Sequence, residues 1–289
     1  MTTLAERLSG TRFGLVLSAG YFGFYGHAGF VDGLLGHGLV PSAFAGTSAG
    51  GLVAAFTAAG LPPAELKALV TSQRREHFWD PDWLGIAVDS VRRGHRPSGL
   101  LKGARFRELL ERHLPARRFE DTAAPLALVA TSLSSRRAVT LTSGDLASAV
   151  HATCAYPGLF QAVRRGDELL WDGGIVDKAP AIALLDAKVT PLDALLVHYL
   201  PSRGDDSTPG GPLAYAAGLS SGFAAVRREH FKLQLELLRH RGVPTYVVTS
   251  HLPPVSPRSM AAGPQAVHAG AASIAHALAA PPRPWEGAD

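Results

Sequence analysis

The stretch AFAGTSAG, residues 43–50, has the pattern of a short buried strand that turns directly into a helix. Its first four residues are apolar or small, and an alanine-rich run follows it as far as Ala59. Residues 46–50 match G-x-S-x-G, in which a sharp strand-to-helix turn exposes a serine hydroxyl at the start of the helix. Glycine at both ends permits the close approach of neighbouring chain that such a turn needs. A glycine-rich turn with a capping serine would give the same letters, so the interpretation depends on the flanking sequence.

Strands and helices alternate along the rest of the chain. Residues 12–18 have the pattern of a buried strand, and residues 27–37 that of an amphipathic helix that ends at Gly38. Further strands are expected over residues 126–133, 138–142, 168–171, 194–200 and 243–249. This alternation predicts an α/β fold, a three-layer α/β/α sandwich with a mainly parallel central sheet.

The composition indicates a globular protein without an internal linker. Of the 289 residues, 46% are hydrophobic and 18% are charged, which is enough apolar material for a core. We expect one domain over residues 1–280 and a disordered tail over residues 281–289. The formal net charge of +4 comes without a dense basic run, so nucleic-acid binding is not expected.

Several features bear on the compartment and on cofactors. The single cysteine, Cys154, rules out a disulfide within the chain. The first ten residues carry Glu6 and Arg7 and lack an apolar core, which does not fit a secretory signal. No run reaches the roughly 18 apolar residues of a membrane span, and we therefore expect a soluble cytoplasmic protein. The histidines and acids show no metal-ligand spacing, so neither a metal nor a cofactor is expected.

Two further motifs could serve the same site as Ser48. The loop SAGYFG, residues 18–23, follows the first strand, and backbone N–H groups in such a turn can stabilise an oxyanion. It lacks the full G-x-G-x-x-G of dinucleotide-binding loops and the lysine of a P-loop. Asp172 ends a strand and precedes Gly173 and Gly174, which places its carboxylate well for reaching into a site. An ordinary Asp-Gly turn would have the same sequence.

Taken together, these segments resemble the patatin-like phospholipase family. That family has a glycine-rich oxyanion loop after the first strand, a G-x-S-x-G elbow soon afterwards, and a later D-G-G or D-G-A motif. Two more segments match. His27-Ala28-Gly29 is similar to the family's H-x-G entry to the first helix, and ATCAYPGLF, residues 152–160, is similar to its small residues leading into P-G-x-F. The resemblance runs from about Arg12 to Pro180, more than half of the chain.

The resemblance implies a serine acyl hydrolase that cleaves lipid or phospholipid esters through a Ser-Asp dyad and an acyl-enzyme. Ser48 would be the nucleophile, and Asp172 would accept its proton and later activate water. The backbone groups that would form the oxyanion hole are those of Gly20, Tyr21, Phe22 and Gly23. The glycines that define the other motifs are Gly46, Gly50, Gly173 and Gly174.

The sequence departs from the family pattern at two places. The oxyanion loop usually reads G-G-G-x-R-G, whereas here Ser18 and Ala19 replace two glycines and Phe22 stands at the arginine. This form is closer to the adiponutrin-like lipases, and it removes any role of the arginine. After D-G-G the family often has asparagine, whereas this chain has DKAP at residues 177–180.

Three alternatives remain open at this stage. The first is an α/β-hydrolase with a triad of Ser48, Asp172 and His198, although that fold places its nucleophile later in the strand order. The second is an acyltransferase that uses the same serine. The third is a catalytically silent lipid-binding module, which the altered oxyanion loop would explain.

An aromatic segment, residues 78–86, is interrupted by proline and contains Trp79 and Trp83. Tryptophan is usually largely buried, so core packing is the first interpretation. The second is a lid or a peripheral contact with a membrane surface. Arg92, Arg93 and Arg96 would then aid binding to an anionic interface.

Overall fold

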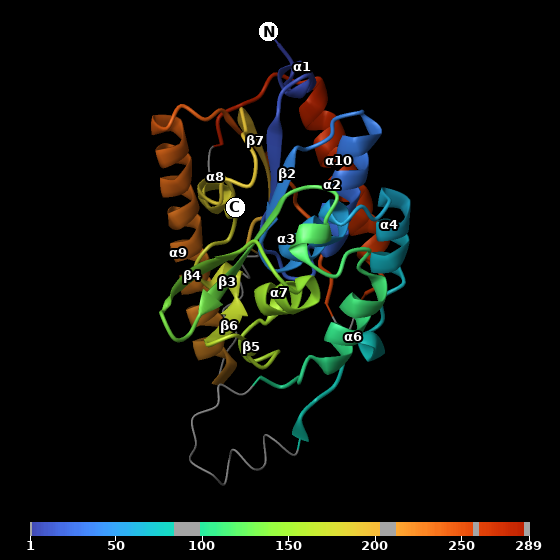
Figure 1. Ribbon diagram of the computed structural model, residues 1–289, viewed down its shortest axis with the longest axis vertical. Coiled ribbons are helices and arrows are strands. Elements are labelled where there is room, and N and C mark those ends of the chain that lie inside the picture. The colour runs from blue at the N-terminus through green and yellow to red at the C-terminus, as the bar shows by residue number, and fades with distance from the viewer. Residues whose placement is uncertain (1, 84–98, 203–211, 257–259, 286–289) are drawn as a thin grey trace.

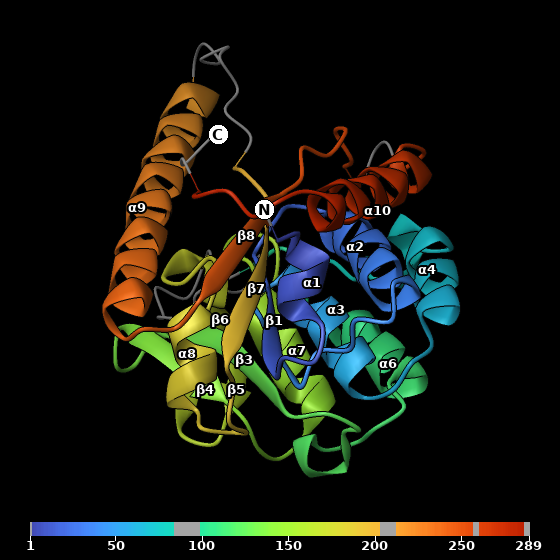
Figure 2. The same cartoon turned by 90° about the horizontal axis from the view of Figure 1, so that it is seen from above.

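A computed structural model describes residues 2–83, 99–202, 212–256 and 260–285, without the side chains of residues 212–220. Eight strands form one sheet with helices on both faces, as predicted (Figure 1). The view from above separates the two helical layers on either side of the sheet (Figure 2). The three arginines expected at a membrane interface, residues 92, 93 and 96, lie outside the described residues.

Five neighbouring strands of the sheet run parallel. In spatial order they are β3 (Leu126–Ser132), β2 (Ala43–Gly46), β1 (Phe13–Leu17), β7 (Ala194–Tyr199) and β8 (Thr245–Thr249). The antiparallel strands β4 (Arg137–Leu141) and β6 (Glu168–Asp172) both pair with β3, and β5 (Val163–Arg165) pairs with β6. Every residue of β1, β2, β3 and β7 is buried, which is why these strands have continuous apolar or small sequences.

Side chains of β1 alternate between two core layers. Phe13, Leu15 and Leu17 belong to one hydrophobic cluster and Val16 to the other. The first layer packs against α1 (Leu4–Leu8), α2 (Phe24–Gly36), α3 (Ala49–Ala58), α4 (Pro63–Thr71), α6 (Ala104–His113), α7 (Leu146–Cys154) and α10 (Gly263–Ala279). The second layer packs against α8 (Ala181–Asp186) and α9 (Pro212–His240). None of the helices in the described ranges is both long and apolar enough to cross a bilayer.

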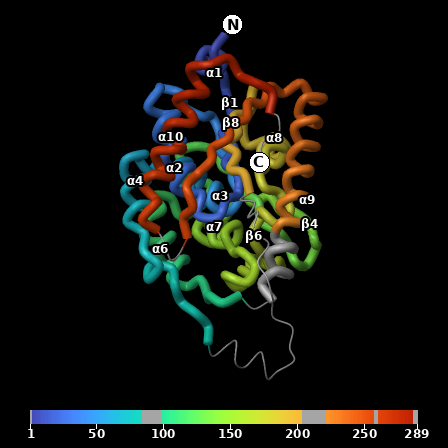
Figure 3. The backbone as a smooth tube through the Cα atoms, turned by 180° about the vertical axis from the view of Figure 1, so that it is seen from behind, coloured from blue at the N-terminus to red at the C-terminus, as the bar shows by residue number. Residues whose placement is uncertain are grey.

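The helix α10 is absent from the sequence-based assignment, although it is the second longest in the described chain. It packs against α2 at the back of the molecule (Figure 3). The contact is so close that a Cβ on Gly29 would lie 1.9 Å from the Val267 carbonyl oxygen, and one on Gly270 would lie 1.9 Å from that of Gly26. Only glycine fits at these two positions, so small residues in both helices allow the packing.

The last described residues, 281–285, include one aromatic side chain that packs onto the core. Trp285 packs edge-on against Tyr199 and Phe231, with ring centroids 5.2 Å and 5.1 Å apart. Its indole belongs to the second core layer. The residues that follow it lie outside the described part of the chain.

Candidate active site

Ser48 lies at the turn between β2 and α3 in a strained backbone conformation. Its φ and ψ are 55° and −125°, in a region that favours glycine over other residues. The turn brings the chain against its neighbours. A Cβ on Gly46 would lie 2.5 Å from the Gly50 carbonyl carbon, and one on Gly50 would lie 2.2 Å from the Leu17 carbonyl oxygen. Both motif glycines are therefore required by close backbone contacts, and strain of this kind is concentrated at functional sites.

The helix α7 holds Ser48 in place. The Thr153 hydroxyl accepts a hydrogen bond from the Ser48 amide at 3.0 Å and donates one to the Val129 carbonyl. The Cys154 thiol donates to the Ser48 carbonyl at 3.2 Å. The sequence placed Thr153 in a family-like stretch of small residues but did not reveal this positioning role.

Asp172 ends β6 and is 2% exposed. Its Oδ1 accepts a hydrogen bond from the Gly174 amide at 2.7 Å, whereas its buried Oδ2 makes no hydrogen bond of good geometry among the described residues. Burial raises the pKa of Asp172 from 3.8 to about 6, against opposing effects from the Ser48 side chain, the Gly174 amide and the charge of Arg227. The Ser48 hydroxyl thus lies near enough to act on this carboxyl as a weak hydrogen-bond donor.

The two glycines after Asp172 bring the three sequence motifs together. A Cβ on Gly173 would lie 2.9 Å from Cγ2 of Thr47, the residue before Ser48. One on Gly174 would lie 2.8 Å from the Cβ of Ala19 in the loop after β1. The three segments are far apart in the sequence. They meet because β1 and β2 are neighbours in the sheet and only β3 separates β2 from β6, whose last residue is Asp172.

Arg227 connects the long helix α9 to this turn. Its Nη1 donates a hydrogen bond to the Gly174 carbonyl at 3.0 Å, and its Nε donates to the Phe223 carbonyl. The same charge lowers the pKa of Asp172. No local pattern in the sequence marks this residue, because 53 positions separate it from Gly174.

The loop after β1 forms a tight turn in which the Gly23 amide donates to the Gly20 carbonyl at 2.9 Å. Of the four backbone amides expected to form an oxyanion hole, that of Gly23 donates within the turn itself. Within the described chain, the amides of Gly20 and Phe22 have no acceptor. Phe22 has a positive φ of 54°, unusual for an aromatic residue, and its ring contacts Tyr21 and Phe24.

The histidine suggested for a triad is part of a buried chain of hydrogen bonds. His27 Nε2 lies 2.8 Å from the Ser18 carbonyl oxygen, His27 Nδ1 lies 2.8 Å from His198 Nδ1, and His198 Nε2 lies 2.8 Å from the Ser250 hydroxyl. Because a carbonyl only accepts, His27 donates to Ser18, His198 donates to His27, and Ser250 donates to His198. Burial lowers the pKa of His27 to about 4 and that of His198 well below its usual value, so both rings are neutral.

This chain of bonds leaves His198 no ring nitrogen for Ser48. These bonds instead hold the Ser18 carbonyl in place. The hydroxyl of the same residue accepts a hydrogen bond from the Leu200 amide at 2.8 Å. The Leu200 side chain packs beneath the loop. If Gly20 or Gly23 had a Cβ, that atom would lie only 2.8 Å or 2.4 Å from Leu200 Cδ1. The two histidines therefore support the base of the turn that carries the free amides.

Comparison with known proteins agrees with this geometry. Residues 15–185 match the profile of the Patatin-like phospholipase family, and this range includes Ser48, Asp172 and the whole loop after β1. The chain belongs to the patatin-like phospholipase family. Over 222 residues it is 32% identical to uncharacterised NTE family proteins of Mycobacterium bovis and Mycobacterium tuberculosis. The match covers 75% of this chain but only 35% of each relative, so this patatin-like chain spans about a third of their length.

A solved structure shares the fold of this patatin-like protein. VipD from Legionella pneumophila has a TM-score of 0.50 and 16% sequence identity, and the match covers 93% of this chain and 67% of VipD. The predicted α/β/α sandwich is therefore a patatin-like fold.

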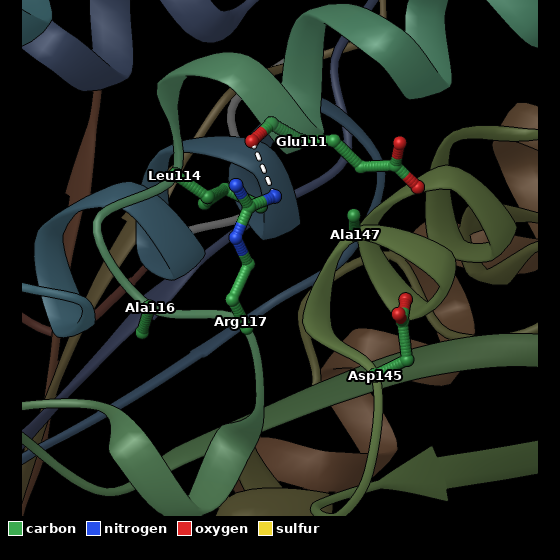
Figure 4. A pocket seen from close by; sticks show the side chains of 6 residues that line it. All are labelled: Glu111, Leu114, Ala116, Arg117, Asp145 and Ala147. Atoms are coloured by element: carbon green, nitrogen blue, oxygen red, sulfur yellow. Dashed lines mark hydrogen bonds between the residues drawn. The ribbon is translucent and has the colours of Figure 1, made fainter.

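A small cleft in this patatin-like domain lies away from the site described above (Figure 4). It opens between α6 and the first turn of α7, at the opposite end of α7 from Thr153. Its polar groups already have partners within the chain. Arg117 donates to the Glu111 carbonyl at 2.6 Å, and the Asp145 carboxylate caps α7 through the Ser148 amide at 2.6 Å. This cleft is therefore explained by local structure.

Proposed function

We propose that the protein is a serine acyl hydrolase that cleaves lipid acyl esters with Ser48 as nucleophile and Asp172 as its only catalytic partner. The observation that carries the proposal is the position of Ser48, strained at the elbow, beside a buried carboxyl with one oxygen lacking a good hydrogen bond. Serine needs an adjacent base to attack an ester. The Asp172 pKa of about 6 makes it a stronger base than an exposed carboxylate.

The reaction proceeds in two balanced halves. The Ser48 oxygen attacks the ester carbonyl carbon while its proton passes to Asp172. The tetrahedral intermediate then expels the alcohol, which takes that proton and leaves an acyl-serine. Water attacks the acyl-serine and gives a proton to Asp172. The acid is released as this proton returns to the Ser48 oxygen.

Backbone amides of the loop after β1 would stabilise the negative oxygen of both tetrahedral intermediates. Gly20 and Phe22 are the candidates because their amides have no acceptor among the described residues. Each donor of this kind contributes roughly 3–4 kcal/mol to the transition state. These donors do not depend on an arginine side chain, so Phe22 at that position is compatible with catalysis.

The test compares a dyad with a triad. Ser48→Ala and Asp172→Asn should each lower turnover of a short-chain ester by about a thousand-fold or more, and Ser48→Ala should abolish fluorophosphonate labelling. His198→Gln is the matched control and should retain substantial activity, as should Gln variants of His27, His151, His230, His251 and His268. A folded histidine variant that is as inactive as Ser48→Ala and, like it, no longer reacts with a fluorophosphonate would establish a triad instead. A His27 or His198 variant that turns over slowly but still labels would have lost only the support of the turn after β1. Wild-type protein that hydrolyses no ester in a lipid panel would favour a silent lipid-binding module.

Asp172→Asn is a fair comparison because it should not unfold the protein. A carboxyl with a pKa raised from 3.8 to about 6 holds its proton more tightly in the folded state. Its ionisation therefore lowers the free energy of unfolding as the pH rises through this window, by up to about 3 kcal/mol. Asparagine keeps the acceptor for the Gly174 amide and removes the buried charge. The variant should be at least as stable as wild type at pH 8.

A further inference from the structure

The long helix α9 has a stripe of large apolar side chains that the protein does not cover. Phe223, Val226, Leu233 and Leu237 are 53%, 67%, 69% and 42% exposed. They account for half of the exposed large hydrophobic residues in the described chain. The helix stands at the outer edge of the molecule in both views (Figures 1 and 2). Single exposed apolar residues are common, but a contiguous row on one helix indicates a contact surface.

The spacing of this stripe is that of a coiled-coil seam. Phe223, Val226, His230, Leu233 and Leu237 follow one another at alternating steps of three and four. In the sequence of the same helix, Ala216 and Leu219 continue the steps toward its N-terminus. A narrow row with this repeat, sustained over three heptads, is the pattern of the a and d positions that pair helix with helix.

The domain itself uses a different face of α9. Among residues 221–240 of the helix, Phe231, Gln234 and Leu238 are buried, and they lie against the second core layer and Asp177. Beside them, Val226, His230 and Leu233 line a shallow apolar groove. The stripe is therefore not needed for packing α9 onto its own domain.

The charges next to the stripe decide between possible occupants. Glu229 and Glu236 hold the positions that flank it on its open side and are exposed. These carboxylates are paired with Lys232 and Arg239 of the same helix, and they leave the open side of the stripe without the basic flank that is typical of contact with an anionic lipid surface. They suit another helix, because flanking charges pair across a coiled coil. An antiparallel pair would bring Glu229 near a second Glu236, and a parallel pair in register avoids this repulsion.

We propose that α9 is a dimerisation helix that pairs in parallel with the α9 of a second copy of this chain. The stripe is self-complementary, as a two-fold symmetric interface requires, and the charge pattern favours the parallel register.

The oligomeric state in solution tests this proposal. Sedimentation equilibrium of the wild-type chain should give a dimer. Leu233→Glu puts two like charges in the seam, which costs several kcal/mol and should weaken dimerisation by at least about 100-fold. Val40→Glu is the matched control, because Val40 is 69% exposed and lies on a loop away from α9. Both variants should hydrolyse a soluble ester like wild type, so that a failure of the esterase proposal and a failure of the dimer are separate results.

Cysteine cross-linking tests the register. A parallel pair in register places each residue of the seam beside its own copy. Val226→Cys and Leu237→Cys should therefore each form a disulfide-linked dimer under mild oxidation. Val40→Cys should not, and wild type, which keeps Cys154, sets the background.

Several results would overturn the proposal. They are a wild-type monomer at every concentration, a dimer that Leu233→Glu leaves intact, or no cross-link at either seam position. A monomer that floats with vesicles of phosphatidylcholine and phosphatidylglycerol, and loses this binding in Leu233→Glu, would instead make a lipid surface the occupant.

Discussion

Asp172 and Arg227 show how two residues from different elements set the pH at which the proposed base works. Burial raises the pKa of Asp172 to about 6, and the positive charge of Arg227 acts in the opposite direction. Arg227 also holds the turn after Asp172 by its bond to the Gly174 carbonyl. Without a positively charged neighbour, the buried carboxyl would have a higher pKa. A larger fraction of it would be protonated at pH 7, and it would be a poorer proton acceptor.

The pH profile of kcat/KM on a soluble ester should therefore have an acidic limb near pH 6, because the base must be ionised. Arg227→Met removes one of the groups that lower the pKa of Asp172 and should move this limb to higher pH. Arg227→Lys keeps the charge and should keep the limb near its original position. Activity at each pH is measured as initial rate against substrate concentration.

Arg239→Met serves as control, since Arg239 is an exposed residue of the same helix paired with Glu236. Its profile should match that of wild type. An acidic limb that stays in place in Arg227→Met would show that Arg227 only holds the turn. A limb that moves equally in Arg239→Met would point to the general charge of the helix.

Among the elements of the fold, the turn after β1 is the one whose shape matters most for the proposed catalysis. The turn is closed by Gly23 and supported below by Leu200, which in turn is fixed by Ser18 and the two buried histidines. Its free amides keep their direction only if the backbone of Gly20 keeps its position. A branched side chain at Gly20 would push against Leu200, 2.8 Å from the new Cβ.

Gly20→Val should therefore lower turnover by about 100-fold to 1,000-fold, the usual effect of losing an oxyanion donor. Ser48 should still react with a fluorophosphonate, only more slowly, because the nucleophile and its base are unchanged. Gly36→Val is the control, since a Cβ there meets nothing within 4 Å. Turnover that is unchanged in Gly20→Val would place the oxyanion hole elsewhere.

The elements around the site could be predicted because their signals are local. The strand before Ser48, the turn and the following helix are encoded in 16 consecutive residues, and the expected bounds agree with β2 and α3. The strand that ends at Asp172 is equally local. Each of these segments has a continuous apolar pattern and glycine where the backbone requires it.

What the sequence did not reveal depends on contacts between distant segments. The helix α10 has mostly alanine and glycine on its buried face, with Gly263, Ala266 and Gly270 where larger residues would mark an amphipathic helix. Its stability comes from close packing on α2, which no local pattern records. Arg227 and Thr153 were missed for the same reason, because their partners lie 53 and 105 residues away.

For the whole molecule, the exposed aromatic residues bear on how a lipid ester would reach the proposed nucleophile, Ser48. Tyr21 and Tyr156 are 58% and 43% exposed. Tyr21 belongs to the turn after β1, and Tyr156 follows the residue whose carbonyl accepts the Asp172 amide. Trp83 is 66% exposed, and Phe78, near the start of the same segment, lies 6.5 Å from the Phe22 ring. These side chains are suited to the interface between water and lipid.

The two tryptophans of this segment should have different roles. Trp79 is half-buried against the core, and the Arg75 guanidinium lies 3.6 Å from its ring centroid, so it contributes to packing. Trp83 has most of its surface in solvent. The alternatives of core packing and lipid contact, which the sequence left open for the whole segment, can therefore be assigned to separate residues and tested separately.

Trp83→Ser should reduce hydrolysis of phospholipid vesicles by about tenfold, because an exposed indole contributes roughly 1–2 kcal/mol at a bilayer interface. Its activity on a soluble short-chain ester and its melting temperature should stay near those of wild type, since it removes no buried contact. Trp79→Ser should instead lower the melting temperature and reduce both activities together. Val40→Ser, equally exposed but at the amino end of β2, should change neither substrate. Equal loss on both substrates in Trp83→Ser, with a lower melting temperature, would assign Trp83 to packing and leave lipid contact to the aromatic residues beside the site.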